Sequence, residues 1–88
     1  MTEPELRSIP PERRNGPPRW EVWQDGQRLG IIVAKKLGGA RNVFYEAIAP
    51  HPRTGKPLSL ELHIDRDDRV QVLVRFATHP EEFRQHWS

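Results

Sequence analysis

The sequence predicts an α+β, mostly β fold: a single antiparallel meander sheet of four to five strands, a short C-terminal helix and a disordered N-terminal arm. Three observations lead to this prediction. The first 18 residues hold five of the nine prolines. Short runs of alternating apolar and polar residues then follow, separated by turn residues, which is the pattern of hairpin-connected strands. Residues 78–88 instead carry the signals of a helix start.

Residues 1–18 are predicted to be a disordered or polyproline-like arm, outside a single small domain at residues 19–88. The few apolar residues of the arm show no period, and its prolines lack the N–H that regular structure uses. We expect the arm to be a solvated leader or, alternatively, a basic arm that uses Arg13 and Arg14 on a partner.

The first two strands are predicted at residues 20–23 and 29–34, joined by an Asp-Gly pair that tolerates the positive φ of a tight hairpin turn. Side chains alternate faces along a strand, so Trp20 and Trp23 point to opposite sides. Because Val22 shares a face with Trp20, we expect Trp20 in the core and Trp23 on the outer face.

A third strand is predicted at residues 42–49, where β-propensity is high, and a proline-rich loop follows at residues 50–57. Residues 58–65 alternate most clearly. Four aliphatic side chains of this stretch are expected to face the core: Leu58, Leu60, Leu62 and Ile64.

Residues 69–76 allow two interpretations. Three valines and Phe76 alternate as in a strand, and β-branched residues favour that state. Val70, Leu73 and Val74 also fit a helical stripe, with Asp67 or Asp68 as the cap. We predict a strand, with a helix as the alternative.

A short C-terminal helix is predicted after Thr78. Thr78 is a suitable N-cap, Pro80 suits the first turn, and Glu81 lies three residues after the cap. Phe83 and Trp87 are four residues apart, so they share one helix face. We expect this face to lie on the sheet.

Composition excludes several classes of function. The chain has no cysteine, which rules out disulfides, thiolate zinc sites and a cysteine nucleophile. The N-terminal residues contain no apolar run typical of a signal peptide, and no stretch approaches transmembrane length. We therefore expect a cytoplasmic protein without a membrane partner.

Two polar clusters could suggest chemistry: Ser59, His63 and Asp65, and His79, Glu82 and His86. Adjacent side chains on one strand face are roughly 7 Å apart, so the first cluster cannot form a local triad. The second cluster lacks a further ligand of known position, as a metal site would need. We expect no catalytic residue, no metal site, no cofactor and no enzymatic activity.

Positive charge gathers in the middle of the chain. Residues 28–56 carry six cationic side chains and one acid, and the whole chain has a net charge of +2. Such asymmetry suggests an anionic partner. We predict a small non-enzymatic protein that binds DNA or RNA through a basic hairpin and an exposed aromatic residue on the sheet. The expected contact residues are Arg19, Trp23, Lys35, Lys36 and Arg41.

Over residues 19–88, the order of strands followed by a C-terminal helix resembles the architecture of several small single-stranded nucleic-acid binders. The alternative is a protein-protein interaction module, such as a small regulator, inhibitor or accessory subunit, that uses the outer sheet face or an edge strand. Ile32, Ala34 and Leu73 are expected beside Trp23 on that outer face. A homodimer would bury this apolar surface.

Overall fold

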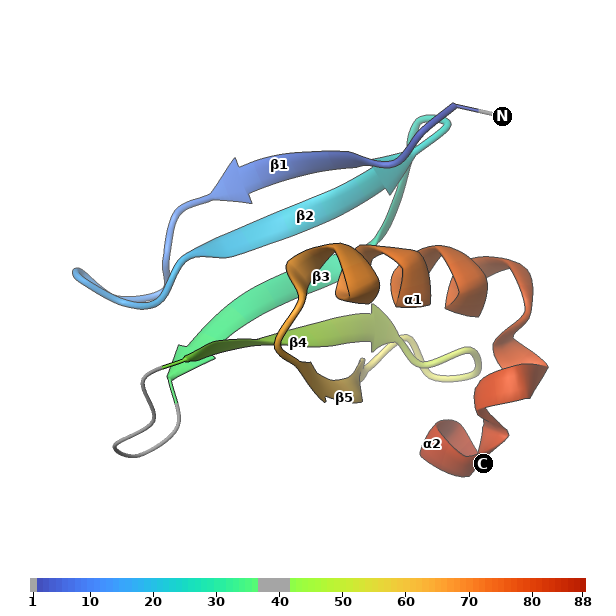
Figure 1. Ribbon diagram of the computed structural model, residues 1–88. Coiled ribbons are helices and arrows are strands. Elements are labelled where there is room, and N and C mark those ends of the chain that lie inside the picture. The colour runs from blue at the N-terminus through green and yellow to red at the C-terminus, as the bar shows by residue number, and fades with distance from the viewer. Residues whose placement is uncertain (1, 37–41) are drawn as a thin grey trace.

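A computed structural model describes residues 2–36 and 42–88, and its strands form one antiparallel sheet with a helix on one face (Figure 1). The strands are β1 (Glu5–Ile9), β2 (Arg19–Gln24), β3 (Gln27–Lys36), β4 (Val43–Pro50) and β5 (Pro57–His63). They are followed by α1 (Arg66–Thr78), the 3₁₀ turn η1 (Pro80–Phe83) and the short α2 (Arg84–Trp87). The order β1-β2-β3-β4-β5 follows the chain, which confirms the predicted meander.

The disorder predicted for residues 1–18 does not extend to β1. This strand pairs antiparallel with β2, with Leu6 opposite Val22. Pro4 and Pro10 flank β1 and do not interrupt it, so each of its residues keeps a backbone N–H for pairing. Leu6 packs against the core and thereby fixes the face that β1 presents to the helix.

Residues 69–76 belong to α1, so the predicted strand is wrong and the helical alternative is correct. The Asp65 side chain caps the helix by accepting a hydrogen bond from the N–H of Asp67 at 2.9 Å. Val70, Leu73 and Phe76 lie on one side of α1 and are buried. The apolar face of the sheet needs a cover, and burying this stripe against it outweighs the local strand preference of the valines.

The core lies between α1 and the sheet. Its buried members are Val22, Leu29, Ile32, Ala47, Ala49, Leu60, Val70, Leu73 and Phe76. The expectation that Ile32, Ala34 and Leu73 lie on the outer face is therefore wrong. Ile32 pairs with Trp20 and therefore lies on the same face of the sheet. Ile32, Ala34 and Leu73 are all buried on the helix side.

The two tryptophans of β2 lie on opposite faces, as predicted. Trp20 packs against the core on the helix side. Trp23 lies on the other face, where the Arg7 guanidinium carbon is 4.3 Å from its ring centroid and its Nε1 donates to Glu21 at 3.2 Å. Both rings are half-buried. The preceding turn has the predicted geometry, since Asp25 and Gly26 both have positive φ.

A bulge in β5 changes which side chains face the core. The register with β4 shifts between Glu46 and Ile48, and Glu61 has a φ of 73°. Leu60 is buried, but Leu62 is exposed because it follows the bulge and pairs with Glu46. The predicted core face of this strand is thus correct for Leu58 and Leu60 and wrong for Leu62 and Ile64.

The C-terminal turns pack on the sheet as predicted, although the helix does not start at Thr78. Thr78 ends α1, and Pro80 opens η1 instead. Phe83 and Trp87 pack against the core. The Trp87 indole donates to the Pro80 carbonyl at 2.8 Å, which holds α2 against the preceding turn.

A close approach between α1 and β3 occurs at Gly30. A methyl group at this position would lie 2.8 Å from Leu73 Cδ2 and closer still to the Ile48 carbonyl oxygen. A backbone carbonyl within a sheet cannot move aside cheaply. The helix can reach the sheet here because β3 has no side chain at Gly30.

We expect Gly30→Ala to lower the free energy of unfolding by about 2–3 kcal/mol, because the added methyl group overpacks the layer between helix and sheet. Gly55→Ala is the control: it meets nothing within 4 Å but has a φ of 74°, so about 1 kcal/mol of backbone strain is expected. Urea denaturation measures both. Equal losses in the two variants would contradict close packing at Gly30.

Arg69 joins α1 to the bulge of β5. Its side chain is buried, and its Nη1 donates to the carbonyls of Leu60 at 2.7 Å and Glu61 at 3.1 Å. The Asp68 carboxylate accepts from Nε at 3.0 Å and from Nη2 at 2.5 Å. The guanidinium thus satisfies two carbonyls that the bulge leaves without a strand partner.

Arg69→Met keeps an aliphatic stem but removes every donor, so the free energy of unfolding should fall by about 2–3 kcal/mol. Arg75→Met is the control in the same helix. Arg75 is exposed and pairs with Glu82 at 2.7 Å, so its loss should cost less than about 1 kcal/mol. Similar urea midpoints for the two variants would show that the buried hydrogen bonds contribute little.

Candidate nucleic-acid interface

The predicted contact residues fall into separate places. Lys35 and Lys36 end β3, and Arg19 begins β2, so these three lie at one end of the sheet. Arg41 lies outside the described residues. The three described cations do not share a face: Arg19 and Lys35 line a cleft on the side opposite α1, whereas Lys36, the next residue of β3, points to the helix side.

Trp23 is not part of this group. It pairs with Arg28, which lies seven positions before Lys35 in β3. At roughly 3.3 Å per residue, more than about 20 Å of strand separates Trp23 from the two lysines. The exposed aromatic expected beside the basic hairpin is therefore not Trp23.

Two of the predicted cations already have acidic partners. Arg19 donates to the Glu12 carboxylate at 3.3 Å and also to the Pro10 carbonyl. Lys35 Nζ lies 2.8 Å from Glu46. Arg19 thus ties the connection between β1 and β2 to the sheet, and Lys35 joins β3 to β4.

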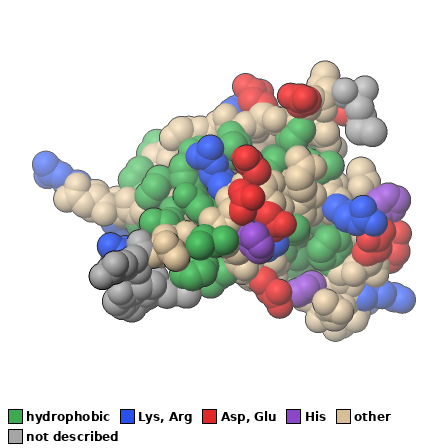
Figure 2. Space-filling model, viewed as in Figure 1, with side chains coloured by type: hydrophobic (Ala, Val, Ile, Leu, Met, Phe, Trp, Pro, Cys, Tyr) green, Lys and Arg blue, Asp and Glu red, His purple; other side chains and the backbone are tan. Residues whose placement is uncertain are grey.

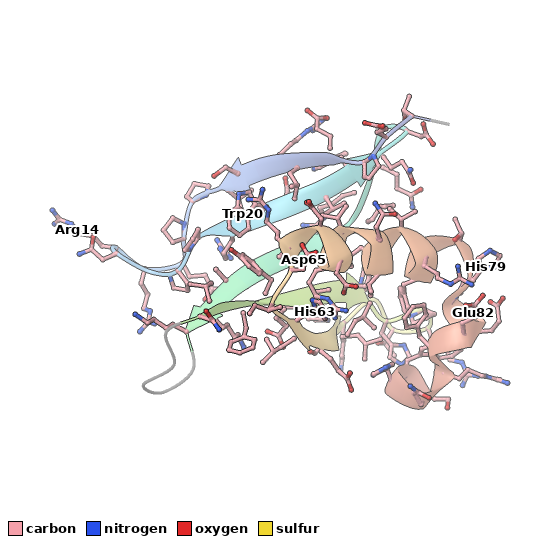
Figure 3. All side chains as sticks on the ribbon, in the orientation of Figure 1. Arg14, Trp20, His63, Asp65, His79 and Glu82 are labelled. Carbon is pink, nitrogen blue, oxygen red and sulfur yellow. The ribbon has the colours of Figure 1, made fainter. Side chains whose placement is uncertain are left out.

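A different aromatic pair lies at the basic end. Trp20 on β2 and Tyr45 on β4 have ring centroids 6.1 Å apart, with planes tilted by 49°. The intervening strand β3 presents the small Ala34 opposite Tyr45, and Ala34 is buried. Figure 3 shows Trp20 beside the first turn of α1. Both rings are only half-buried, because they lie next to the helix start and not beneath its length.

Two cations border this aromatic pair. The Arg66 guanidinium carbon lies 5.0 Å from the Trp20 ring centroid. Lys36 is exposed and pairs with Val43, which is two residues before Tyr45 and so shares its face. Within residues 2–36 and 42–88, neither cation forms an ion pair. We call Trp20, Lys36, Tyr45 and Arg66 the aromatic-basic cluster.

The surroundings of the cluster are apolar along the sheet, while Asp65, Asp67 and Asp68 flank Arg66 at the helix start. Figure 2 shows hydrophobic side chains gathered on this part of the helix face. Val43 is 40% exposed and Ile64 is 52% exposed. Arg14 extends from the tip of the β1–β2 connection at the same end of the sheet (Figure 3). Sequence reasoning missed Trp20, Tyr45 and Arg66, because only the register of the strands and the position of the helix bring them to one end of one face.

The polar clusters weighed for catalysis or metal binding are not assembled. Ser59 donates to Glu46 at 2.7 Å, while His63 Nδ1 accepts the N–H of Asp65 at 2.9 Å. Glu82 pairs with Arg75, and His79 lies near Glu81. In the part of the chain that the structure describes, no group of three such side chains could hold a metal ion.

The face of the sheet opposite α1 carries a groove of different character. Two adjoining clefts of about 280 and 330 Å³ share Glu12, Ile31 and Ile48 in their walls. Four ion pairs lie on or beside this face: Arg7–Glu5, Arg19–Glu12, Arg28–Glu21 and Lys35–Glu46. Arg13 also lines the first cleft, but the other charges are paired, so the groove suits a phosphate backbone less well than unpaired cations would.

The described helices include none with the length and apolar character of a membrane span. Comparisons with known protein families, with curated protein sequences and with solved structures gave no match. The function of this chain is therefore argued from its own side chains and their geometry.

Glu46 makes the stability of this end of the sheet depend on pH. Burial raises the pKa of Glu46, but the hydrogen bonds from Lys35 and Ser59, with the Lys35 charge, outweigh burial and hold the pKa below its ordinary value of 4.5. A carboxyl with a lowered folded pKa stabilises the fold above its unfolded pKa. This stabilisation is lost as pH falls through the folded pKa.

We expect the free energy of unfolding to decline as pH drops below 4.5, and Glu46→Gln to flatten part of that decline. Urea denaturation at a series of acidic pH values measures the free energy of unfolding of both proteins. Glu3→Gln, at an exposed position, is the control and should keep the slope of the parent protein. An unchanged slope in Glu46→Gln would disprove the contribution of Glu46.

Proposed function

We propose that this protein binds single-stranded nucleic acid at the aromatic-basic cluster. One observation carries the proposal. Two half-buried rings on one face, Trp20 and Tyr45, are bordered by Arg66 and Lys36, which form no ion pair within the described residues. Aromatic platforms with cationic borders are the usual means of holding single strands without sequence preference.

Each member of the cluster has a role in this proposal. The Tyr45 ring is a surface on which a base stacks, and base stacking contributes about 1–3 kcal/mol per base. Arg66 already covers Trp20, and its planar guanidinium offers a second stacking surface. The Lys36 ammonium, on the same face, attracts a phosphate.

Single strands fit better than a duplex. Both rings are half-buried, and a ring that stacks on a base needs a base whose own face is free. Bases in a duplex are stacked on their neighbours. Arg14, in the connection at this end of the sheet, adds attraction for the backbone that does not depend on sequence.

A protein-interaction role is the second candidate, and the groove on the opposite face favours it. Ile31, Val33 and Ile48 supply apolar surface there, while Arg19 and Lys35 at its border are paired with acids. Such a surface suits a protein segment better than a polyanion. Binding at this groove would be insensitive to salt, which separates it from the first candidate.

The test is fluorescence anisotropy of a labelled oligothymidine at several salt concentrations. For Lys36→Gln/Arg66→Gln we expect weaker binding at low salt. The slope of log K against log salt should shrink by about 0.7, since Lys36 is the phosphate contact and each such contact on a single strand contributes about 0.7. Tyr45→Leu should weaken binding about 5- to 100-fold with little change in slope.

Arg53→Gln/Lys56→Gln is the matched control, because it removes the same charge from the loop at the other end of the sheet. Its slope should equal that of the parent protein. Equal losses in the two double variants would mean that net charge, and not the cluster, drives binding. Absence of binding at low salt would reject the proposal.

A further inference from the structure

β1 is an edge strand with a free side. In the described part of the chain it pairs with β2 alone, and it forms the outermost strand of the sheet (Figure 1). Unpaired backbone N–H and C=O groups at such an edge can accept another strand. The other edge strand, β5, is bent at Glu61, and Arg69 occupies the carbonyls of Leu60 and Glu61. The sheet can therefore be extended more readily at β1.

The side chains of β1 are arranged for pairing with a copy of the same strand. Glu5 and Arg7 lie on the face that carries Trp23, with 62% and 48% of their side chains exposed. Leu6 points to the helix side and is half-buried. One face of β1 is thus charged with both signs, and the other carries an aliphatic side chain.

The register follows from these side chains. If two β1 strands pair antiparallel about a two-fold axis at Leu6, each Glu5 lies opposite an Arg7 and the two Leu6 side chains lie opposite each other. An axis at Arg7 would instead place two guanidinium groups opposite each other, and like charges in that position are destabilising. We propose that β1 is a homodimer interface, formed by antiparallel pairing with a second copy of this chain about Leu6.

The helix side offers room for the second Leu6. A cleft of about 370 Å³ lies between β1 and the start of α1, and Leu6 and Val70 contribute to its walls. The other walls are Pro4 and the polar Glu3, Asp67 and Gln71, so the leucine of the second copy would contact Leu6 and Val70 in a cleft of mixed character. The interface is short, because β1 has five residues, so the dimer is weak and depends on protein concentration.

Two-fold pairing also limits the assembly to two chains. Both β1 edges are used, and the combined sheet ends in a β5 strand on each side. Those outer strands carry the bulge and the Arg69 hydrogen bonds, which hinder further strand addition. The expected product is a dimer and not a fibre.

Sedimentation velocity over a wide range of protein concentration tests the proposal. The average mass should rise from that of one chain towards that of two. Arg7→Glu and Glu5→Arg should each weaken self-association at least ten-fold, because each places like charges across the axis. An equimolar mixture of the two variants should associate again, since one then carries two acids and the other two cations on the charged face.

Arg28→Glu is the control, because Arg28 is an exposed cation of the inner strand β3 and does not lie at the edge. It should associate like the parent protein. Replacing Arg7 also removes its contact with the Trp23 ring, so circular dichroism is used to show that the variants are folded. A monomer at every concentration, or no rescue in the mixture, would overturn the proposal. Nucleic-acid binding by the monomer would be unaffected by either result.

Discussion

The contact of α1 with β3 at Gly30 governs the arrangement of this small protein. Leu73 is fully buried there, in space that any other residue at position 30 would fill. A helix of 13 residues is about 20 Å long, whereas the ten residues of β3 extend about 33 Å. One helix cannot cover such a sheet. The aromatic-basic cluster, the groove and the β1 edge are the surfaces that remain.

Arginine compensates for part of this incomplete cover. A guanidinium lies over each of the three tryptophans: Arg66 over Trp20, Arg7 over Trp23, and Arg53 and Arg84 near Trp87. Planar, weakly hydrated guanidinium groups shield aromatic surface from water while keeping their charge at the surface. In the proposed binding mode the ring and the cation that stabilise the fold at Trp20 would also contact the nucleic acid.

Local signals determined much of the fold, and tertiary context determined the rest. The Asp-Gly turn and the four strands from β2 to β5 follow from turn chemistry and alternation. The valines of α1 misled the prediction, because their burial on the sheet decides their conformation. The positive φ of Glu61, which turned Leu62 outward, has no signal in a non-glycine residue. Trp20, and not Trp23, lies beside Tyr45 at the basic end of the sheet. This placement depends on the register of β2, β3 and β4, which the sequence pattern does not show.

The strand order has a consequence for how the chain folds. Every strand pairs only with its neighbours in sequence, so each pairing closes a short loop and the entropy cost stays small. The tight turn at Asp25 and Gly26 is a natural starting point from which the sheet grows outward. α1 follows all five strands in the chain. During synthesis the sheet therefore emerges before its cover, and the apolar face around Ile32 and Ala47 stays exposed to water until α1 is made.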